Sequence, residues 1–289
     1  MSRDHCQRLQ SHTVARLLLQ HNLIKSAFNG RLLFAPHSND GNYEVLDCAT
    51  GSGESNVLSP AQVQFRMHHL LISCLASWMM DLCNELSSST KIHGVDIESS
   101  RFPTSYPDNI SFSIHSVLSL PDGWSGRFDF VNQRLLGGGL KRDEFPAAIG
   151  EIYRVLKPGG WAQICEYGLW GFSLGPATDT LFTLYNRLFV RNGLTIRIFA
   201  DIPDMMREAG FRNVHVERRG YPIGGEQGRV GRMCALEHYR SLKSQMVKHG
   251  LVESDEEISG IIDAMEKEWE QVDRAEAELV YAWAQKQIA

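Results

Sequence analysis

The sequence lacks three features that would each have assigned the protein to a class. Its six cysteines include no Cys-x-x-Cys pair, so they predict reduced thiols rather than a metal-binding framework. The apolar stretch at residues 70–80 is too short to cross a bilayer, which takes roughly 20 residues. The net charge of −5 and the pI near 6.1 give no sign of the strongly basic face that nucleic-acid binding needs.

The chain also lacks internal repeats, low-complexity tracts and a signal-peptide-like start. Its first residues, Met1–His5, are polar, so we expect a cytoplasmic protein that binds neither membranes nor nucleic acid. Hydrophobic residues make up 43% of the chain and charged residues 22%, as in an ordinary globular protein. The 289 residues predict a single domain over residues 1–289.

Short apolar strands alternate with helical segments along the chain. Strands are expected at residues 43–48, 91–96, 110–115, 127–132, 161–167 and 214–216. Helices are expected at residues 6–28, 142–156, 179–192, 202–209 and about 230–249. This alternation predicts an α/β fold with a parallel sheet. A further helix begins after Ser254, and residues 278–284 are either its continuation or a final strand.

The most informative motif is the stretch Val45–Gly53, a buried strand that runs into a small turn. The strand carries Asp47, and the turn contains Gly51 and Gly53, whose missing Cβ atoms let a ligand approach the backbone. A second strand ends in Asp96, and the run LKPGGW at residues 156–161 joins a helix to a later strand. These signals, in this order, indicate a nucleotide-type cofactor at the carboxyl ends of parallel strands.

Together with Trp78–Leu82 and Phe128–Val131, these motifs resemble the class I methyltransferases that use S-adenosylmethionine. The resemblance covers roughly residues 7–285 and extends to a fungal subgroup with natural-product methyltransferases and a regulator associated with the velvet complex. It implies a Rossmann-like fold with a seven-stranded, mostly parallel sheet, an N-terminal helix and a helical cap. The expected parts are an N-terminal segment (1–42), a cofactor-binding core (43–168), a helical cap (169–250) and a C-terminal helix with a possible last strand (251–289).

The resemblance also implies roles for individual residues around S-adenosylmethionine. Asp96 would accept hydrogen bonds from the ribose hydroxyls, and Ile97 would pack on the adenine. The turn after the first strand would face the methionine end, and polar residues after the third and fourth strands would line the remainder. The complete expected set is Asp47, Ala49, Gly51, Gly53, Asp96, Ile97, Ser116, Val117, Asn132 and Gln133.

Three departures from the family pattern stand out. Ala49 replaces a common glycine, and Ser116 replaces the acid that usually meets the adenine amino group. The third departure is a spacing of 43 positions between Gly53 and Asp96, against the roughly 20 expected between such a turn and its acid. The excess, residues 54–76, is 23 residues long. Two interpretations stay open: a genuine insertion beside the cofactor turn, or a retained intron, because 23 codons preserve the reading frame.

The expected reaction is methyl transfer from S-adenosylmethionine to an oxygen or nitrogen of a small secondary metabolite. Tyr167 and Trp170, together with Glu166, are expected on the acceptor side, after the fifth strand. No catalytic base is identified, because in-line displacement can be accelerated mainly by orientation. Two alternatives remain open: a methyltransferase-like regulator in a nuclear protein complex, and an inactive scaffold of the same fold. Protein partners are left open.

Overall fold

The computed structural model describes residues 17–37, 42–50, 76–99, 102–170 and 174–288. Its centre is a seven-stranded sheet in the order β3-β2-β1-β4-β5-β7-β6, in which β1 to β5 are parallel and β7 runs antiparallel to both of its neighbours. The strands are β1 (Glu44–Cys48), β2 (Lys91–Asp96), β3 (Ile110–Ile114), β4 (Phe128–Arg134), β5 (Leu156–Trp170), β6 (Arg212–Pro222) and β7 (Glu276–Gln285). The predicted Rossmann-like class I methyltransferase fold is therefore confirmed.

Strands β4 and β5 are longer than the sequence predicts. Asn132, at the end of the expected fourth strand, and Gln133, just beyond it, both lie within β4, because β4 pairs with β5 as far as Arg134. Tyr167, at the end of the expected fifth strand, and Trp170, beyond it, both belong to β5, because pairing with β7 continues the strand to Trp170. The additional length places Gln133 and Trp170 in the sheet and not in the loops that follow it.

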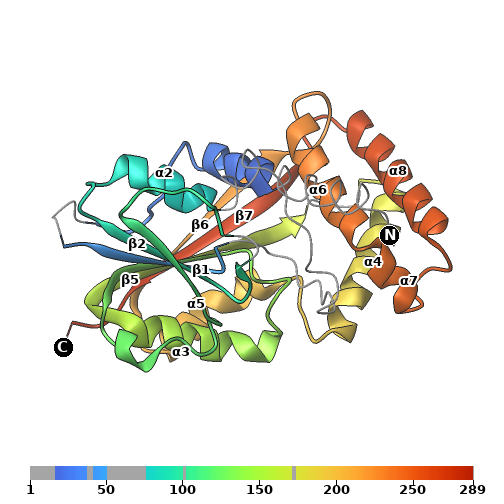
Figure 1. Cartoon of the computed structure of the whole chain (residues 1–289). Helices are drawn as coiled ribbons and strands as arrows, with labels where there is room; N and C mark the ends of the chain where they lie inside the picture. Colours follow the sequence, from blue (N-terminus) through green and yellow to red (C-terminus); the bar gives the residue numbers. More distant parts are fainter. Residues whose placement is uncertain (1–16, 38–41, 51–75, 100–101, 171–173, 289) are drawn as a thin grey trace.

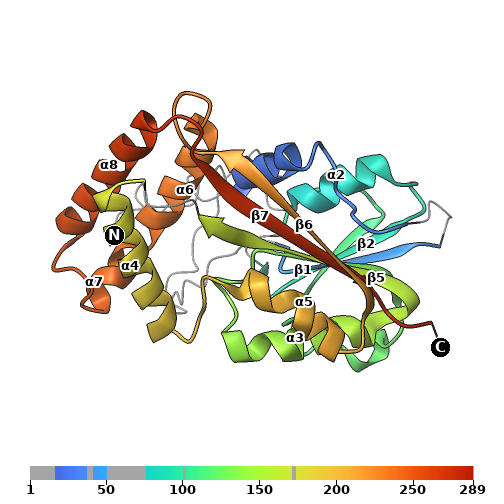
Figure 2. The same cartoon turned by 180° about the vertical axis from the view of Figure 1, so that it is seen from behind.

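Helices cover both faces of the sheet (Figures 1 and 2). One face is covered by the helix at residues 17–27 and by α2 (Ser77–Glu85). The other is covered by α3 (Phe145–Val155), which follows the 3-10 turn η5 (Arg142–Glu144), and by α5 (Ile198–Glu208). The apolar stripe predicted for the 142–156 segment is the buried face of α3, since Ala148, Ile149 and Ile152 are inaccessible to solvent or nearly so.

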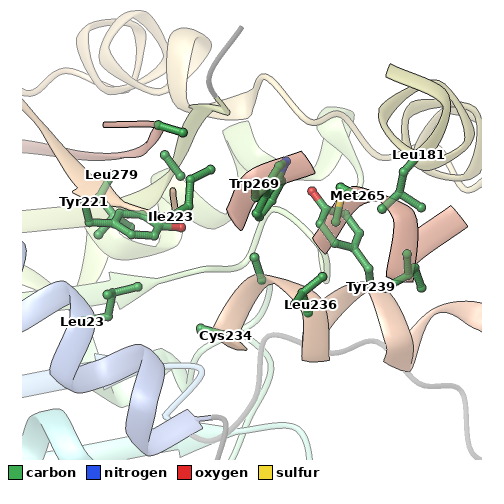
Figure 3. Close-up of a cluster of buried hydrophobic side chains, with 14 of the residues drawn as sticks. Leu23, Leu181, Tyr221, Ile223, Cys234, Leu236, Tyr239, Met265, Trp269 and Leu279 are labelled. Carbon is green, nitrogen blue, oxygen red and sulfur yellow. The ribbon is translucent and has the colours of Figure 1, made fainter. Parts of the chain in front are cut away.

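A separate group of helices lies beyond the carboxyl end of β5 (Figure 1). It consists of α4 (Pro176–Arg191), α6 (Arg229–Ser241), α7 (Lys243–Lys248) and α8 (Asp255–Gln271). Figure 3 shows its core, where Trp269, Tyr239 and Met265 are fully buried. Of the expected cap at residues 169–250, α5 and β6 instead belong to the layers of the sheet, because α5 packs on α3 and β5.

Of the two possibilities left open for residues 278–284, the structure shows the final strand, because α8 ends at Gln271 and β7 follows. Ser254 accepts a hydrogen bond from the Glu257 amide (3.2 Å) and so caps α8 at its N-terminus. The chain then returns as β7, which inserts between β5 and β6. Among the described residues, no helix is long and apolar enough to cross a membrane.

Candidate functional site

The turn after β1 holds Ala49 in a left-handed backbone conformation. Its φ of +60° is one that side chains with a Cβ rarely adopt. Thr50 stabilises the turn, because its hydroxyl lies 3.0 Å from the carbonyl of Asp47 and 3.2 Å from that of Val95. The turn therefore joins the carboxyl ends of β1 and β2. Gly51, Gly53 and all of the segment 54–76 except Ala76 lie outside the described residues.

Asp47 begins a chain of buried hydrogen bonds that crosses the sheet. Asn132 Nδ2 donates to Asp47 Oδ1 (2.6 Å), and Gln163 Nε2 donates to Asn132 Oδ1 (2.8 Å). Gln163 also donates to the carbonyl of Leu32 (2.9 Å) and accepts from the amide of Phe34 (3.0 Å). Burial raises the pKa of Asp47 to about 6, although Arg134 and the Asn132 hydrogen bond both favour the ionised form. The chain thus connects the site to the segment preceding β1.

Gln133 lies beside Asn132 in the sequence but on the opposite face of β4, where its neighbours across the sheet are Cys48 and Ile164. Its side chain is fully buried, and within the described part of the chain neither its amide nitrogen nor its amide oxygen has a hydrogen-bond partner. Buried polar groups are nearly always paired, so an unpaired amide at a strand end is a candidate ligand contact.

The end of β2 places an acid and an exposed apolar side chain next to each other. Asp96 is only 6% exposed, and its Oδ1 accepts a hydrogen bond from the amide of Glu98 (3.2 Å). Ile97 is 75% exposed, which is unusual for isoleucine. Together the two residues offer hydrogen-bond acceptors and an apolar surface at the same strand end.

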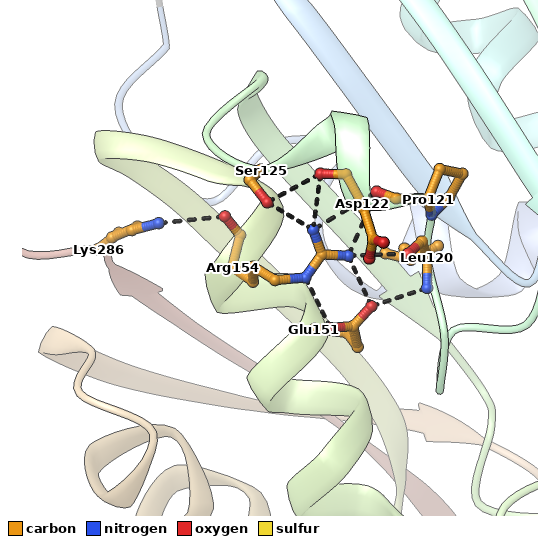
Figure 4. A network of polar contacts seen from close by, with 7 residues as sticks. All are labelled: Leu120, Pro121, Asp122, Ser125, Glu151, Arg154 and Lys286. Atoms are coloured by element: carbon orange, nitrogen blue, oxygen red, sulfur yellow. Dashed lines mark hydrogen bonds and ion pairs between the residues drawn. The ribbon is translucent and has the colours of Figure 1, made fainter.

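Ser116 and Val117 follow β3 in a tight turn. The Ser116 hydroxyl accepts from the amide of Leu118 (3.2 Å), and Val117 is buried. The loop beyond them is held by a polar network around Arg154 of α3 (Figure 4).

In this network, Arg154 donates to the carbonyl of Leu120 (2.9 Å), to the hydroxyl of Ser125 (2.7 Å) and to Glu151. Glu151 in turn accepts from the amide of Leu120 (2.7 Å), and the adjacent Arg154 holds its pKa below the usual range. The short helix η4 (Asp122–Trp124) lies within this braced loop. The network therefore fixes the chain that follows Ser116.

Two residues of β5 were expected on the acceptor side. The Tyr167 hydroxyl accepts a hydrogen bond from Gln20 Nε2 (2.7 Å), which links β5 to the helix at 17–27. Trp170 is the last residue of β5, and its side chain lies outside the described structure.

Glu166, the neighbour of Tyr167, points to the opposite face of β5. Its carboxylate accepts from the amides of Leu136 (2.7 Å) and Gly137 (3.1 Å). Burial raises the pKa of Glu166 to about 8, although these two hydrogen bonds act in the opposite direction. Among the described residues, no group of His, Cys, Asp and Glu is arranged to hold a metal ion.

Sequence reasoning missed several residues that the structure adds to this region. Gln163 is hidden in the middle of an apolar strand, and only the pairing of β4 with β5 brings it to Asn132. Arg134 gave no distinct signal, because it follows the polar residues Asn132 and Gln133. His21 and Asp81 gave none, since each lies on an ordinary amphipathic helix.

No protein-family model matches the chain. Comparison with curated proteins finds the N-methyltransferase verN of Clonostachys rogersoniana, 26% identical over an alignment of 285 residues that covers 94% of this chain and 89% of that protein. The N-methyltransferase sirN of Leptosphaeria maculans is 28% identical over 226 residues, 76% of this chain and 71% of that protein.

Among solved structures, the chain is similar to the Haemonchus contortus phosphoethanolamine N-methyltransferase 2, crystallised with phosphomonomethylethanolamine and S-adenosylhomocysteine. The TM-score is 0.51 at 16% identity over 88% of this chain. The match spans about half (51%) of the Haemonchus chain, and it supports the fold alone.

Proposed function

The chain belongs to the class I S-adenosylmethionine-dependent methyltransferases and is related to fungal N-methyltransferases, and we propose that it methylates a nitrogen atom of a small secondary metabolite. The observation that carries the proposal is a similarity to an N-methyltransferase that extends over 94% of the chain. Such coverage includes the helices beyond β5 as well as the sheet. An oxygen acceptor, which the sequence alone left equally open, is the less favoured form of the same reaction.

The residues at the carboxyl ends of β1, β2 and β4 fit the chemistry of S-adenosylmethionine. The carboxylate of Asp96 suits a ribose diol, and the exposed Ile97 next to it suits an adenine ring. The unpaired amide of Gln133 suits a polar partner that the described chain does not supply. We assign Asp47 and the Ala49 turn to the methionine end, and Ser116 and Val117 to the adenine.

When bound, S-adenosylmethionine supplies an electrophilic methyl group on a sulfonium. The protein's task is then to orient a nucleophile in line with that carbon and to exclude water. We place the acceptor beside Tyr167 and Trp170, at the carboxyl end of β5 where the helical cap begins. A neutral amine already carries the lone pair it needs, so the assignment requires no general base.

The test is calorimetric titration of the full chain with S-adenosylhomocysteine. Micromolar binding is expected, and Asp96→Ala is expected to weaken it by about 10- to 100-fold because the charged acceptor of the ribose diol is lost. Asp108→Ala is the matched control: it removes an exposed acid at the opposite end of the sheet, before β3, and should leave affinity unchanged.

Binding would then justify screening small secondary amines and phenols with S-adenosylmethionine that carries a labelled methyl group. Label in an amine product would support the nitrogen assignment, and label only in phenols would replace it with the oxygen form. A folded protein that binds no S-adenosylhomocysteine would refute the enzyme and favour the inactive scaffold.

A further inference from the structure

Arg134 places a positive charge near Asp47, the buried acid of the candidate cofactor site. The register aligns Asp47 of β1 with Asn132 of β4, and Arg134, two residues further on, points to the same face of the sheet. Strand spacing and rise put the Cα atoms of Asp47 and Arg134 about 8 Å apart. The charge of Arg134 reaches Asp47, because it lowers the pKa of that carboxyl against the effect of burial.

The two side chains are close but are not joined to each other. Among the described residues, no carboxylate lies within ion-pair distance of Arg134. Its described partners are His21, whose Nδ1 lies 3.2 Å from Arg134 Nη1, and the hydroxyl of Tyr281. A guanidinium has five N–H donors, so these two neutral partners leave three donors and do not neutralise the charge.

His21 holds Arg134 without neutralising it. A guanidinium can only donate, so His21 Nδ1 accepts and its proton lies on Nε2, which donates to Asp81 Oδ2 (3.1 Å). Burial, together with the charge of Arg134, lowers the pKa of His21 to about 4, so the ring is neutral at pH 7. Lys25 Nζ donates to the same Asp81 oxygen (2.6 Å) and balances its charge.

We propose that Arg134 binds the α-carboxylate of the methionine end of S-adenosylmethionine, opposite Asp47, which faces the α-ammonium, and that His21 positions Arg134. This inference rests on the proposed function. An amino-acid end carries one negative and one positive group on the same carbon, and Asp47 and Arg134 offer the complementary pair on one face of the sheet. A guanidinium also matches a carboxylate geometrically, through two parallel hydrogen bonds.

The test combines a change in the protein with a change in the ligand. Decarboxylated S-adenosylmethionine keeps the ribose, adenine, sulfonium and amino group and lacks only the carboxylate. The full chain is expected to bind S-adenosylmethionine about 10- to 100-fold more tightly than the decarboxylated ligand. In Arg134→Gln this preference should fall to within about twofold, because the variant loses affinity for only one of the two ligands.

Asp96→Asn is the matched control, since it should weaken both ligands equally and keep their ratio. His21→Asn, as a change in a positioning residue, should reduce the ratio only in part. An Arg134→Gln variant that retains the full preference would overturn the inference, as would an unmodified protein that does not distinguish the ligands. The comparison of the two ligands on the unmodified protein tests the inference even if Arg134→Gln fails to fold. Failure of the unmodified protein to bind either ligand would instead refute the proposed function on which the inference depends.

Discussion

Replacing Glu166 by glutamine is expected to make the protein's stability less sensitive to pH between pH 5 and 8. Burial raises the pKa of Glu166 from 4.5 to about 8 in the folded protein. Between these values the folded chain keeps a proton that the unfolded chain has lost. The free energy of unfolding therefore falls as the pH rises, and the contribution is complete below pH 4.5 and lost as the pH passes 8.

The structure sets the size of this effect. A shift of about 3.5 pKa units at about 1.36 kcal/mol per unit gives an upper limit of about 5 kcal/mol, of which about 3 kcal/mol falls between pH 5 and 8. Glutamine has nearly the same shape, and its carbonyl oxygen can still accept from the amides of Leu136 and Gly137. The variant should thus lose the titrating carboxyl and keep the hydrogen bonds from Leu136 and Gly137.

The assay is urea unfolding of both proteins at pH 5, 6, 7 and 8, with free energies compared at equal m-values. The Glu166→Gln protein should gain stability relative to the unmodified protein as the pH rises, since every other titrating group, including the buried Asp47, cancels in the difference. Glu208→Gln, at an exposed glutamate ending α5, is the control and should leave the pH profile unchanged. Parallel profiles for Glu166→Gln and the unmodified protein would show that Glu166 is ionised when buried, and the reasoning would be wrong.

Four further substitutions test the packing and the backbone. Ala49→Gly should stabilise the protein by about 0.5–1 kcal/mol in thermal unfolding, because glycine tolerates the φ of +60°; a lower melting temperature would contradict this. Trp269→Ala should cost about 3–5 kcal/mol in urea unfolding, since the side chain is fully buried in the cap core, and a loss below 1 kcal/mol would argue against that core. Gly228→Ala should cost more than about 2 kcal/mol, because its Cβ would collide with the backbone of Ile223, whereas Gly150→Ala, with open space around it, should stabilise α3 by about 0.5–1 kcal/mol.

The fold could be predicted from local patterns to a large extent. Apolar runs ending in Asp47 and Asp96 marked β1 and β2, and the periodicity of residues 142–156 marked the buried face of α3. These features depend on neighbours within a few positions, which the sequence displays directly. The order of the elements then indicated a parallel sheet, and with it the edge at which Asp47 and Asp96 lie.

Strand ends could not be predicted as well, because partners far away in the sequence determine them. β5 reaches Trp170 only because β7, more than 100 residues later, continues to pair with it. β4 includes Asn132 and Gln133 because β5 pairs with it as far as Arg134. The segment at residues 230–249, expected as one helix, is interrupted at Leu242 between α6 and α7, where the chain turns within the cap.

The sequence by itself determined the class of fold, the family and the acids at the ends of β1 and β2, because each follows from short motifs and their order. Only the tertiary structure decided what surrounds those acids: the Asn132–Gln163 hydrogen bonds behind Asp47, and the approach of His21 to Arg134. His21 and Arg134 lie 113 positions apart, and no local pattern couples them. Their contact exists because the apolar face of the first helix packs in the same core as Cys165 of β5, the residue that lies opposite Arg134 in the sheet.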